Sequence, residues 1–179
     1  ISEIILEENQ IKTVKIENEK IKGYIQIIKT SKEDNKVTGT KKDSPLEGVK
    51  FEIYDEKGNL IQKLTTDTNG MAKSKDLEKG FYRVKEVETN EWYLLDKNVY
   101  ETEIKNNHQV VTLNLENIPK NPDEEINKKG PDEAFAGDEI QYNISLKNSG
   151  NVELENFIWE DEIPTDFIRI TKIKLGTYN

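Results

Sequence analysis

The chain has 179 residues, a formal net charge of −9, no cysteine and one histidine. The lack of cysteine excludes disulfides and thiolate metal sites. A single histidine excludes a histidine-cluster metal site and disfavours histidine acid–base catalysis. An acidic chain without a basic cluster is a poor partner for nucleic acid, and no apolar run is long enough to span a membrane. We therefore expect no cofactor, no metal, no nucleic-acid partner and no membrane contact from these residues.

The sequence predicts an all-β fold. Threonine, valine, isoleucine and tyrosine recur at alternate positions, and turns rich in glycine and asparagine separate these runs. Such alternation is typical of antiparallel sheets with one buried and one solvent-facing side, and strands at this spacing indicate β-sandwiches. In chain order we expect strands at 24–30, 49–54, 60–66, 81–88, 99–105 and 109–117, turns at 57–58 and 67–70, and a mobile polar loop at 31–46.

Three segments follow one another along the chain: residues 1–22, 23–119 and 120–179. The first segment repeats the end of the second with an offset of 99 residues, because five of the 14 positions from Ile5 to Asn18 are identical and Asn18 falls on Asn117. We interpret residues 1–22 as the terminal strands of a preceding module. The chain then reads as a piece of a longer tandem array.

Three predicted strands of the middle segment end an apolar row with a polar residue. These residues are Lys29, Glu86 and Asn117. Taken singly, each is best explained as a strand-end side chain that reaches solvent. If the three strands are neighbours, a buried lysine requires an acidic partner, because an unpaired buried charge costs several kcal/mol. The coincidence therefore predicts a buried polar group in which Lys29 pairs with Glu86.

Such a group permits one covalent step. Burial favours the neutral forms of amine and carboxyl, so Lys29 can pass a proton to Glu86 and become a nucleophile. Protonated Glu86 can polarise the Asn117 amide and then donate a proton to the departing ammonia. The product is an isopeptide bond between Lys29 and Asn117, a single self-modification without turnover. The alternative is the same fold held by a buried Lys29–Glu86 pair without the bond.

Residues 23–119 resemble a Cna B-type domain, the prealbumin-like fold of SpaA-type pilin and adhesin proteins of Gram-positive bacteria. The motifs that carry the resemblance are GYIQIIK at 23–29, PLEGVKFEIYDEKGN at 45–59, TTDTNG at 65–70, LEKGFYRVKEV at 77–87 and LNLENIP at 113–119. The resemblance implies tandem Ig-like and prealbumin-like β-sandwich modules. It also implies a Lys29–Asn117 isopeptide bond assisted by Glu86, with Asn18 as the equivalent asparagine of the preceding repeat.

The sequence departs from the family pattern after Glu86. Thr89 and Asn90 stand where the family has Ala-Pro, and Trp92 replaces a glycine. These changes affect the expected turn more than the glutamate. No pilin polymerisation motif or sorting signal is present, so the sequence does not support a role for these residues in polymerising a pilus backbone.

Residues 120–179 are expected to form a linker and an incomplete Ig-like surface repeat. The run from Gly137 to Asn151 is similar to a surface-protein repeat with the pattern G-D-x-I-x-Y-x-I followed by N-x-G-N. Lys128 and Asp161 each follow an apolar row, which suggests a second crosslink whose third partner would lie beyond Asn179. The simpler interpretation makes Asp161 a turn carboxylate before Pro164.

Together these features predict a structural stalk or spacer module of a cell-wall-anchored bacterial surface adhesin or pilus-related protein. We expect an extracellular monomer that contacts adjacent modules of its own chain, with host extracellular matrix bound by other domains. Beyond the self-crosslink, no enzymatic activity is expected. The alternative function is a module that itself binds a host matrix protein or glycan, for which Trp92, Tyr93 and Tyr100 are the candidate surface aromatics.

Overall fold

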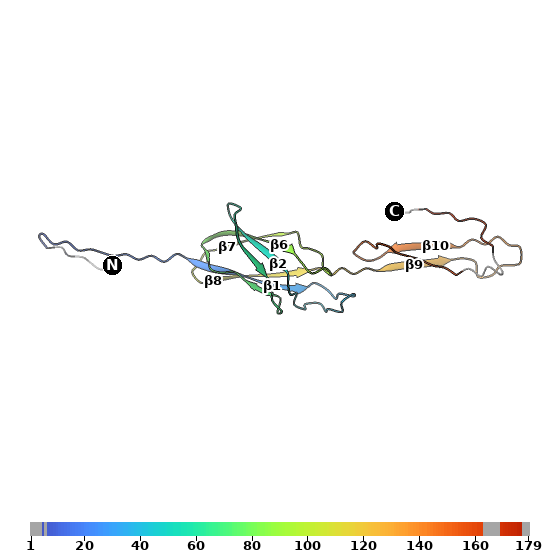
Figure 1. The fold of residues 1–179 in the computed structure, drawn as a ribbon, viewed down its shortest axis with the longest axis horizontal. Helices are drawn as coiled ribbons and strands as arrows, with labels where there is room; N and C mark the ends of the chain where they lie inside the picture. The colour runs from blue at the N-terminus through green and yellow to red at the C-terminus, as the bar shows by residue number, and fades with distance from the viewer. Residues whose placement is uncertain (1–4, 6, 163–168, 177–179) are drawn as a thin grey trace. The chain divides into compact units, whose positions relative to one another are not determined.

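The computed structural model describes residues 5, 7–162 and 169–176 and divides the chain into two units, Ile1–Asn121 and Pro122–Asn179 (Figure 1). The described residues contain strands and no helix, so none of them forms a helix that could cross a membrane. The strands are β1 Lys22–Ser31, β2 Lys50–Asp55, β3 Leu60–Thr65, β4 Met71–Lys73, β5 Leu77–Glu78, β6 Gly80–Glu88, β7 Val99–Ile104, β8 Gln109–Asn117, β9 Glu124–Lys129 and β10 Asn143–Asn148.

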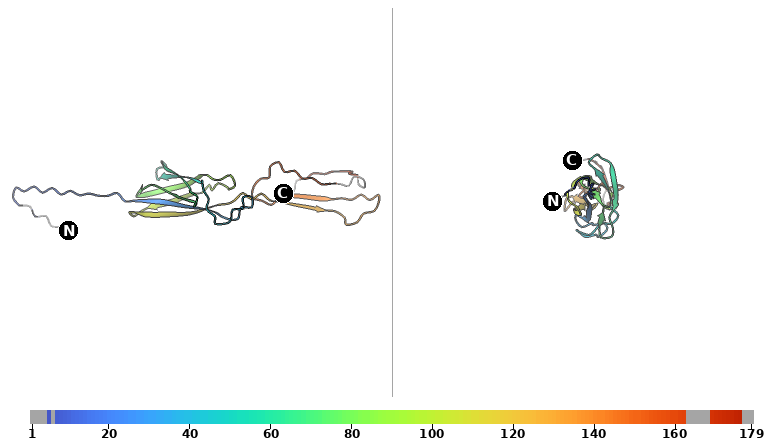
Figure 2. Two further views of the ribbon diagram at one scale, coloured as in Figure 1. Left: turned by 60° about the horizontal axis from the view of Figure 1, so that its bottom comes forward. Right: turned by 90° about the vertical axis from the view of Figure 1, so that its left-hand side faces the viewer.

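The first unit is a sandwich of two four-stranded sheets. In one sheet, β1 pairs with the short strands β4 and β5 at different points along its length, and it also pairs with β8. The second sheet has the strand order β3-β2-β6-β7. Every pairing in this unit is antiparallel except that of β1 with β8, which run side by side in the same direction (Figure 2). Both sheets contribute to one apolar core, which includes Ile25, Ile27, Phe51, Ile53, Val84 and Leu115.

The alternation in β1 explains its place at the centre of its sheet. Every second residue from Gly23 to Ser31 is buried, as expected for a strand with one face on the core. Gly23 begins this face beside β8, where an added Cβ would lie 2.6 Å from the Gln109 carbonyl oxygen. The parallel pairing of β1 and β8 therefore begins at a position that only glycine fits without a shift of the backbone.

The predicted all-β fold and its six main strands are confirmed. Two short strands, β4 and β5, were not expected and pair with β1. The mobility predicted for the loop at 31–46 stays a prediction. Asn35 in that loop is buried. Its side-chain oxygen accepts hydrogen bonds from the Val37 and Thr38 N–H groups, and its side-chain nitrogen donates a hydrogen bond to the Trp92 carbonyl.

The segments outside this sandwich are less buried. The described residues before Lys22 contain no strand, so the interpretation of residues 1–22 as part of a preceding module stays a prediction. In the second unit, β9 and β10 form an antiparallel pair, and every residue of the two strands is exposed. β9 begins in the stretch expected to be a linker. The assignment of this unit to an Ig-like repeat also stays a prediction.

Candidate crosslinking site

Three residues predicted from the strand pattern meet between the two sheets of the first unit. Lys29 lies near the end of β1 and Asn117 ends β8, so parallel pairing brings them to the same end of one sheet. Glu86 reaches them from β6 in the opposite sheet. Their exposed fractions are 0% for Lys29, 4% for Glu86 and 1% for Asn117. We call these three residues the Lys–Glu–Asn cluster.

One carboxylate contacts both the amine and the amide. Lys29 Nζ lies 2.8 Å from Glu86 Oε2, and Asn117 Nδ2 donates a 2.8 Å hydrogen bond to Glu86 Oε1. Lys29 Nζ also donates a 3.1 Å hydrogen bond to the carbonyl oxygen of Glu116, the residue before the asparagine. The ring of Phe51 lies 5.8 Å from the amine. The amine is therefore held beside Asn117 in a site from which water is excluded.

The turn at Asp67–Gly70 fixes the backbone of Lys29. The Lys29 N–H donates a 2.8 Å hydrogen bond to the Gly70 carbonyl, and the Lys29 carbonyl accepts a 2.9 Å hydrogen bond from Leu46. Gly70 has a φ of +69°, and a Cβ there would lie 2.4 Å from the Lys29 carbonyl oxygen. The glycine of this turn is thus required both by its conformation and by its close approach to the Lys29 backbone.

One buried oxygen of the cluster, Asn117 Oδ1, has no hydrogen-bond donor. The carboxylate oxygen Glu86 Oε2, in contrast, has the Lys29 ammonium as its partner. A buried oxygen without a donor is costly unless the site uses it. No group of three or more acidic or histidine side chains in the described part of the chain is placed to hold a metal ion.

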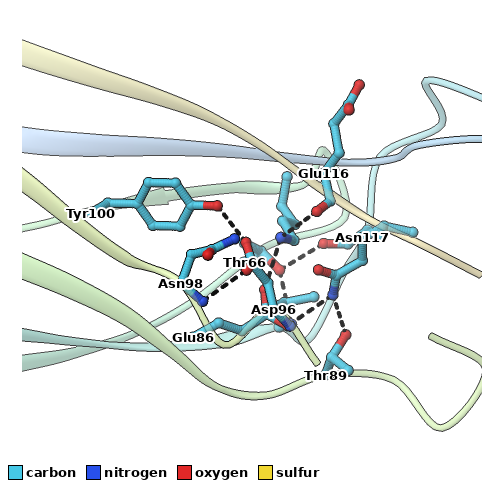
Figure 3. Close-up of polar contacts among 11 residues, drawn as sticks. Thr66, Glu86, Thr89, Asp96, Asn98, Tyr100, Glu116 and Asn117 are labelled. Carbon is cyan, nitrogen blue, oxygen red and sulfur yellow. Dashed lines mark hydrogen bonds and ion pairs between the residues drawn. The ribbon is translucent and has the colours of Figure 1, made fainter. Parts of the chain in front are cut away.

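Thr89 completes the surroundings of the amide. Asn117 Nδ2 contacts Thr89 Oγ1 at 2.7 Å as well as Glu86 Oε1 (Figure 3). Glu86 Oε1 and Thr89 Oγ1 thus both bind the nitrogen of the Asn117 amide. Thr89 was noted in the sequence only as a departure from the family pattern, and no periodic signal identified it because it follows the end of β6.

The segment after β6 also holds the carboxyl of Glu86. The Asp96 N–H donates a 3.2 Å hydrogen bond to Glu86 Oε1, and the Asp96 carboxylate accepts hydrogen bonds from the Tyr100 hydroxyl and the Asn98 N–H (Figure 3). Burial, followed by the hydrogen bond to Asp96, raises the pKa of Tyr100 to about 12. Burial alone would raise the pKa of Asp96, but the hydrogen bonds and the charge of Lys29 lower it overall.

The three aromatic residues proposed as a binding surface do not form one. Tyr93 is 4% exposed and belongs to the core, and Tyr100 packs against that core with its hydroxyl on Asp96. Trp92 is 40% exposed. The expectation of an exposed aromatic patch from these residues is therefore wrong, because two of the three side chains face inward.

In the second unit, the structure brings Lys128 and Asp161 together. Lys128 Nζ lies 2.8 Å and 2.9 Å from the two carboxylate oxygens of Asp161, and 5.0 Å from the centre of the Tyr142 ring. The Lys128 side chain is 42% exposed and that of Asp161 23%. The two residues form an ion pair, and a covalent bond between them stays a prediction. Pro164, invoked in the alternative interpretation of Asp161, lies outside the described residues.

The comparison with protein families agrees with this description of the first unit. The SpaA prealbumin-like fold domain matches residues 23–119. The trypsin-resistant surface T6 protein of Streptococcus pyogenes serotype M6 is 31% identical over 163 residues, which cover 83% of this chain and 30% of that protein. Among solved structures, the Bacillus anthracis TIE protein is 27% identical with a TM-score of 0.47, over 59% of this chain and 18% of that one. A variant of the major pilin subunit of Bacillus cereus is 25% identical with a TM-score of 0.47, over 61% and 31%.

The fold and the matched residues define the class of protein, a prealbumin-like β-sandwich domain of the kind found in Gram-positive surface proteins. The chain belongs to the SpaA prealbumin-like domain family, as its motifs predicted. It spans less than a third of the length of each relative named above.

Proposed function

We propose that this chain is part of the stalk of a cell-wall-anchored surface adhesin or pilus-related protein, and that an intramolecular isopeptide bond between Lys29 and Asn117 locks its central module. One observation carries the proposal. The buried carboxyl of Glu86 contacts the amine of Lys29 through one oxygen and the amide of Asn117 through the other. A purely structural ion pair would not need an asparagine amide on the second oxygen.

The reaction requires no group from outside the cluster. Lys29 transfers a proton to Glu86 Oε2, and its neutral amine attacks the Asn117 side-chain carbonyl carbon to form the new C–N bond. The bond from that carbon to Nδ2 then breaks. Glu86 Oε1, which already accepts a hydrogen bond from Nδ2, is placed to return the proton to the leaving nitrogen. The amine gives up its second proton as the amide forms, and Glu86 takes this proton, so that one ammonia leaves and Glu86 ends as the neutral acid.

The arrangement also supports activation of the carbonyl. A half-turn of the Asn117 amide exchanges Nδ2 and Oδ1, and would place Oδ1 against protonated Glu86 and the Thr89 hydroxyl. Both groups would then donate hydrogen bonds to the oxygen on which negative charge develops. Because the reacting groups are held together by the fold, about 7–11 kcal/mol of the barrier can be offset by proximity in a favourable case.

The topology supports a mechanical role for such a bond. The chain enters the sandwich at the start of β1 and leaves it at the end of β8, and these two strands are parallel neighbours. Force on the two ends therefore shears β1 against β8. A bond from Lys29 to Asn117 would carry this force directly and leave residues 30–116 outside the loaded path. The chain has no cysteine, so no disulfide can serve this purpose.

Intact mass under denaturing conditions tests the bond. We expect the wild-type chain to weigh about 17 Da less than its sequence, the mass of one ammonia. Lys29→Ala and Asn117→Ala should each have the full mass of their sequence, and Glu86→Ala should lose ammonia far more slowly or not at all. Asn114→Ala, an asparagine change on the exposed face of β8, is the matched control and should show the same loss as wild type. A wild-type mass equal to that of the unmodified sequence would overturn the proposal.

Thr89→Val should slow bond formation by roughly fivefold, because it removes one hydrogen bond to the amide, worth about 1 kcal/mol. The measurement is the time course of ammonia loss in freshly translated protein, followed by mass. Thr112→Val changes an exposed threonine of β8 and should leave the rate unchanged. Equal rates for wild type and Thr89→Val would show that Thr89 does not position the amide.

A further inference from the structure

A second carboxylate, that of Asp96, lies beside the Lys–Glu–Asn cluster but takes no part in the steps by which the proposed bond forms. The Asp96 N–H donates a 3.2 Å hydrogen bond to Glu86 Oε1, so its backbone contacts the acid of the cluster. Its carboxylate accepts hydrogen bonds from the Tyr100 hydroxyl and, at 3.0 Å, from the Asn98 N–H (Figure 3). Tyr100 therefore holds in place the residue whose backbone holds Glu86.

Asp96 carries a negative charge at neutral pH. Burial raises the pKa of its carboxyl, but the hydrogen bonds from Tyr100 and Asn98 and the positive charge of Lys29 lower that pKa overall. Burial and the hydrogen bond to Asp96 raise the pKa of Tyr100 to about 12, so its hydroxyl keeps its proton and remains a donor. A fixed anion therefore stands next to the two groups that exchange a proton in the cluster.

The surroundings of the Glu86 carboxyl show which charges act on it. Its titratable neighbours come from three elements and are Lys29 of β1, Asp96 of the segment after β6 and Tyr100 of β7. β2 faces the carboxyl with the buried ring of Phe51, and β8 faces it with the amide of Asn117. On β6 itself, Glu88 is exposed and pairs with Lys50. Asp96 is thus the negative charge that these elements place beside Glu86.

The proposed reaction changes the charges that Asp96 faces. Lys29 and Glu86 begin as an ion pair and end as a neutral amide and a neutral acid. A nearby negative charge disfavours a second ionised carboxylate. Once Lys29 has given up its proton, the charge of Asp96 therefore opposes loss of this proton from Glu86 to solvent. Glu86 must keep the proton until it is passed to the leaving nitrogen.

We propose that Asp96, held by Tyr100, is a positioning residue for the crosslinking reaction: its N–H fixes Glu86 Oε1, and its negative charge retains on Glu86 the proton that Lys29 gives up. The inference rests on the proposed bond between Lys29 and Asn117. Asp96 acts through Glu86 and forms no bond of its own. The reaction still transfers protons from the amine to Glu86, forms one C–N bond and releases one ammonia.

Two substitutions separate the charge of Asp96 from the hydrogen bond that holds it. Asp96→Asn removes the charge but keeps the backbone N–H and a side-chain oxygen that can accept hydrogen bonds. Tyr100→Phe removes the hydroxyl but keeps the charge. One matched control is Asp76→Asn, at an exposed aspartate directly before β5, which pairs with the other end of β1. The second is Tyr54→Phe, because the Tyr54 hydroxyl binds the Glu52 carboxylate on the outward side of β2.

The measurement is the rate of ammonia loss as a function of pH. Each chain is kept unfolded in urea and diluted into buffers from about pH 4 to about pH 10, and its intact mass is followed with time. The wild-type rate should be highest where the Lys29–Glu86 pair holds one proton and should fall on both sides. Circular dichroism of the same samples establishes that folding is complete before ammonia is lost.

The two variants should differ in how the pH profile changes. Asp96→Asn should move both limbs of the profile to lower pH by about 0.5–1 unit, because each proton of the pair is lost more easily without the neighbouring negative charge. Tyr100→Phe should slow the reaction about fivefold at every pH and leave the limbs in place, since one hydrogen bond is lost and the charge remains. Asp76→Asn and Tyr54→Phe should follow wild type.

The possible outcomes distinguish this inference from the bond on which it rests. If wild type loses no ammonia, the Lys29–Asn117 bond is disproved and the role of Asp96 is disproved with it. If wild type loses ammonia but Asp96→Asn has unmoved limbs, even with a lower rate, Asp96 is merely structural and the inference is overturned while the bond stands. Equal rates for wild type and Tyr100→Phe would overturn the role of Tyr100.

A measurement on the crosslinked wild-type chain covers the case in which Asp96→Asn does not fold. Carbon-13 NMR of the Glu86 carboxyl reports its protonation directly. With the positive charge of Lys29 gone and the negative charge of Asp96 still present, Glu86 should be a neutral acid at neutral pH. An ionised Glu86 in the crosslinked chain would overturn the inference, because Asp96 would then fail to retain the proton.

Discussion

Pulled from its two ends, the wild-type module should not lengthen by unfolding, whereas Asn117→Ala should unfold in a step of roughly 300 Å. The estimate comes from the residues between Lys22 and Asn117, at about 3.3–3.6 Å each when extended, less the length of the folded strand. In the wild type the proposed bond leaves only residues 22–29 in the loaded path before it reaches Asn117. These residues already form the extended strand β1, so little length remains to be gained.

Force spectroscopy can make this measurement on the chain itself. Because the sequence has no cysteine, Ile21→Cys and Pro122→Cys introduce two unique attachment points, one just before β1 and one shortly after β8. Asn114→Ala, which alters β8 on its exposed face, should behave as wild type. A step of about 300 Å in the wild-type module, at forces that unfold Asn117→Ala, would show that no bond carries the load.

The cluster was predictable because its signal is local. A strand alternates its faces at every residue, so Lys29 and Asn117 were assigned to the inner faces of their strands from the apolar residues two and four positions before them. Glu86 was assigned to the inner face of its strand in the same way, from Tyr82 and Val84. A buried lysine requires an acidic partner, so the three residues were predicted to lie together although the sequence does not show how their strands pair. The register of β1 on β8 was not predictable from the pattern, because parallel pairing depends on the whole sandwich.

The residues that the sequence did not reveal act through contacts made after a strand has ended. Thr89 and Asp96 follow β6 and reach the cluster because the chain turns back over it, which no periodicity records. The buried Asn35 was hidden for a similar reason, since a polar loop predicts exposure unless its hydrogen-bond partners are known. The strands β4 and β5 are too short to alternate visibly and exist because β1 supplies them with a partner.

Removing either charge of the buried pair should cost more stability than any surface change in this module. In an Asn117→Ala background, which cannot form the bond, Lys29→Met leaves the Glu86 carboxylate buried without its counter-ion. Glu86→Gln leaves the Lys29 amine buried without its counter-ion. Each change is expected to lower the free energy of unfolding by about 3–5 kcal/mol. The double variant should lose much less than the sum, because no uncompensated charge remains.

Urea unfolding measures the interaction free energy between Lys29 and Glu86. The four chains required are the Asn117→Ala background, the two single changes in it and their combination. The matched control is Lys50 of β2 with Glu88 of β6, an ion pair of the same length, 2.8 Å, but with side chains 49% and 59% exposed. The double-mutant cycle of Lys50 and Glu88 should give an interaction free energy of no more than about 1 kcal/mol, as exposed ion pairs do. If the Lys29–Glu86 losses were additive, the two groups would not act as a desolvated pair. Proton transfer between them would then have no basis, even in a module that proved to be crosslinked.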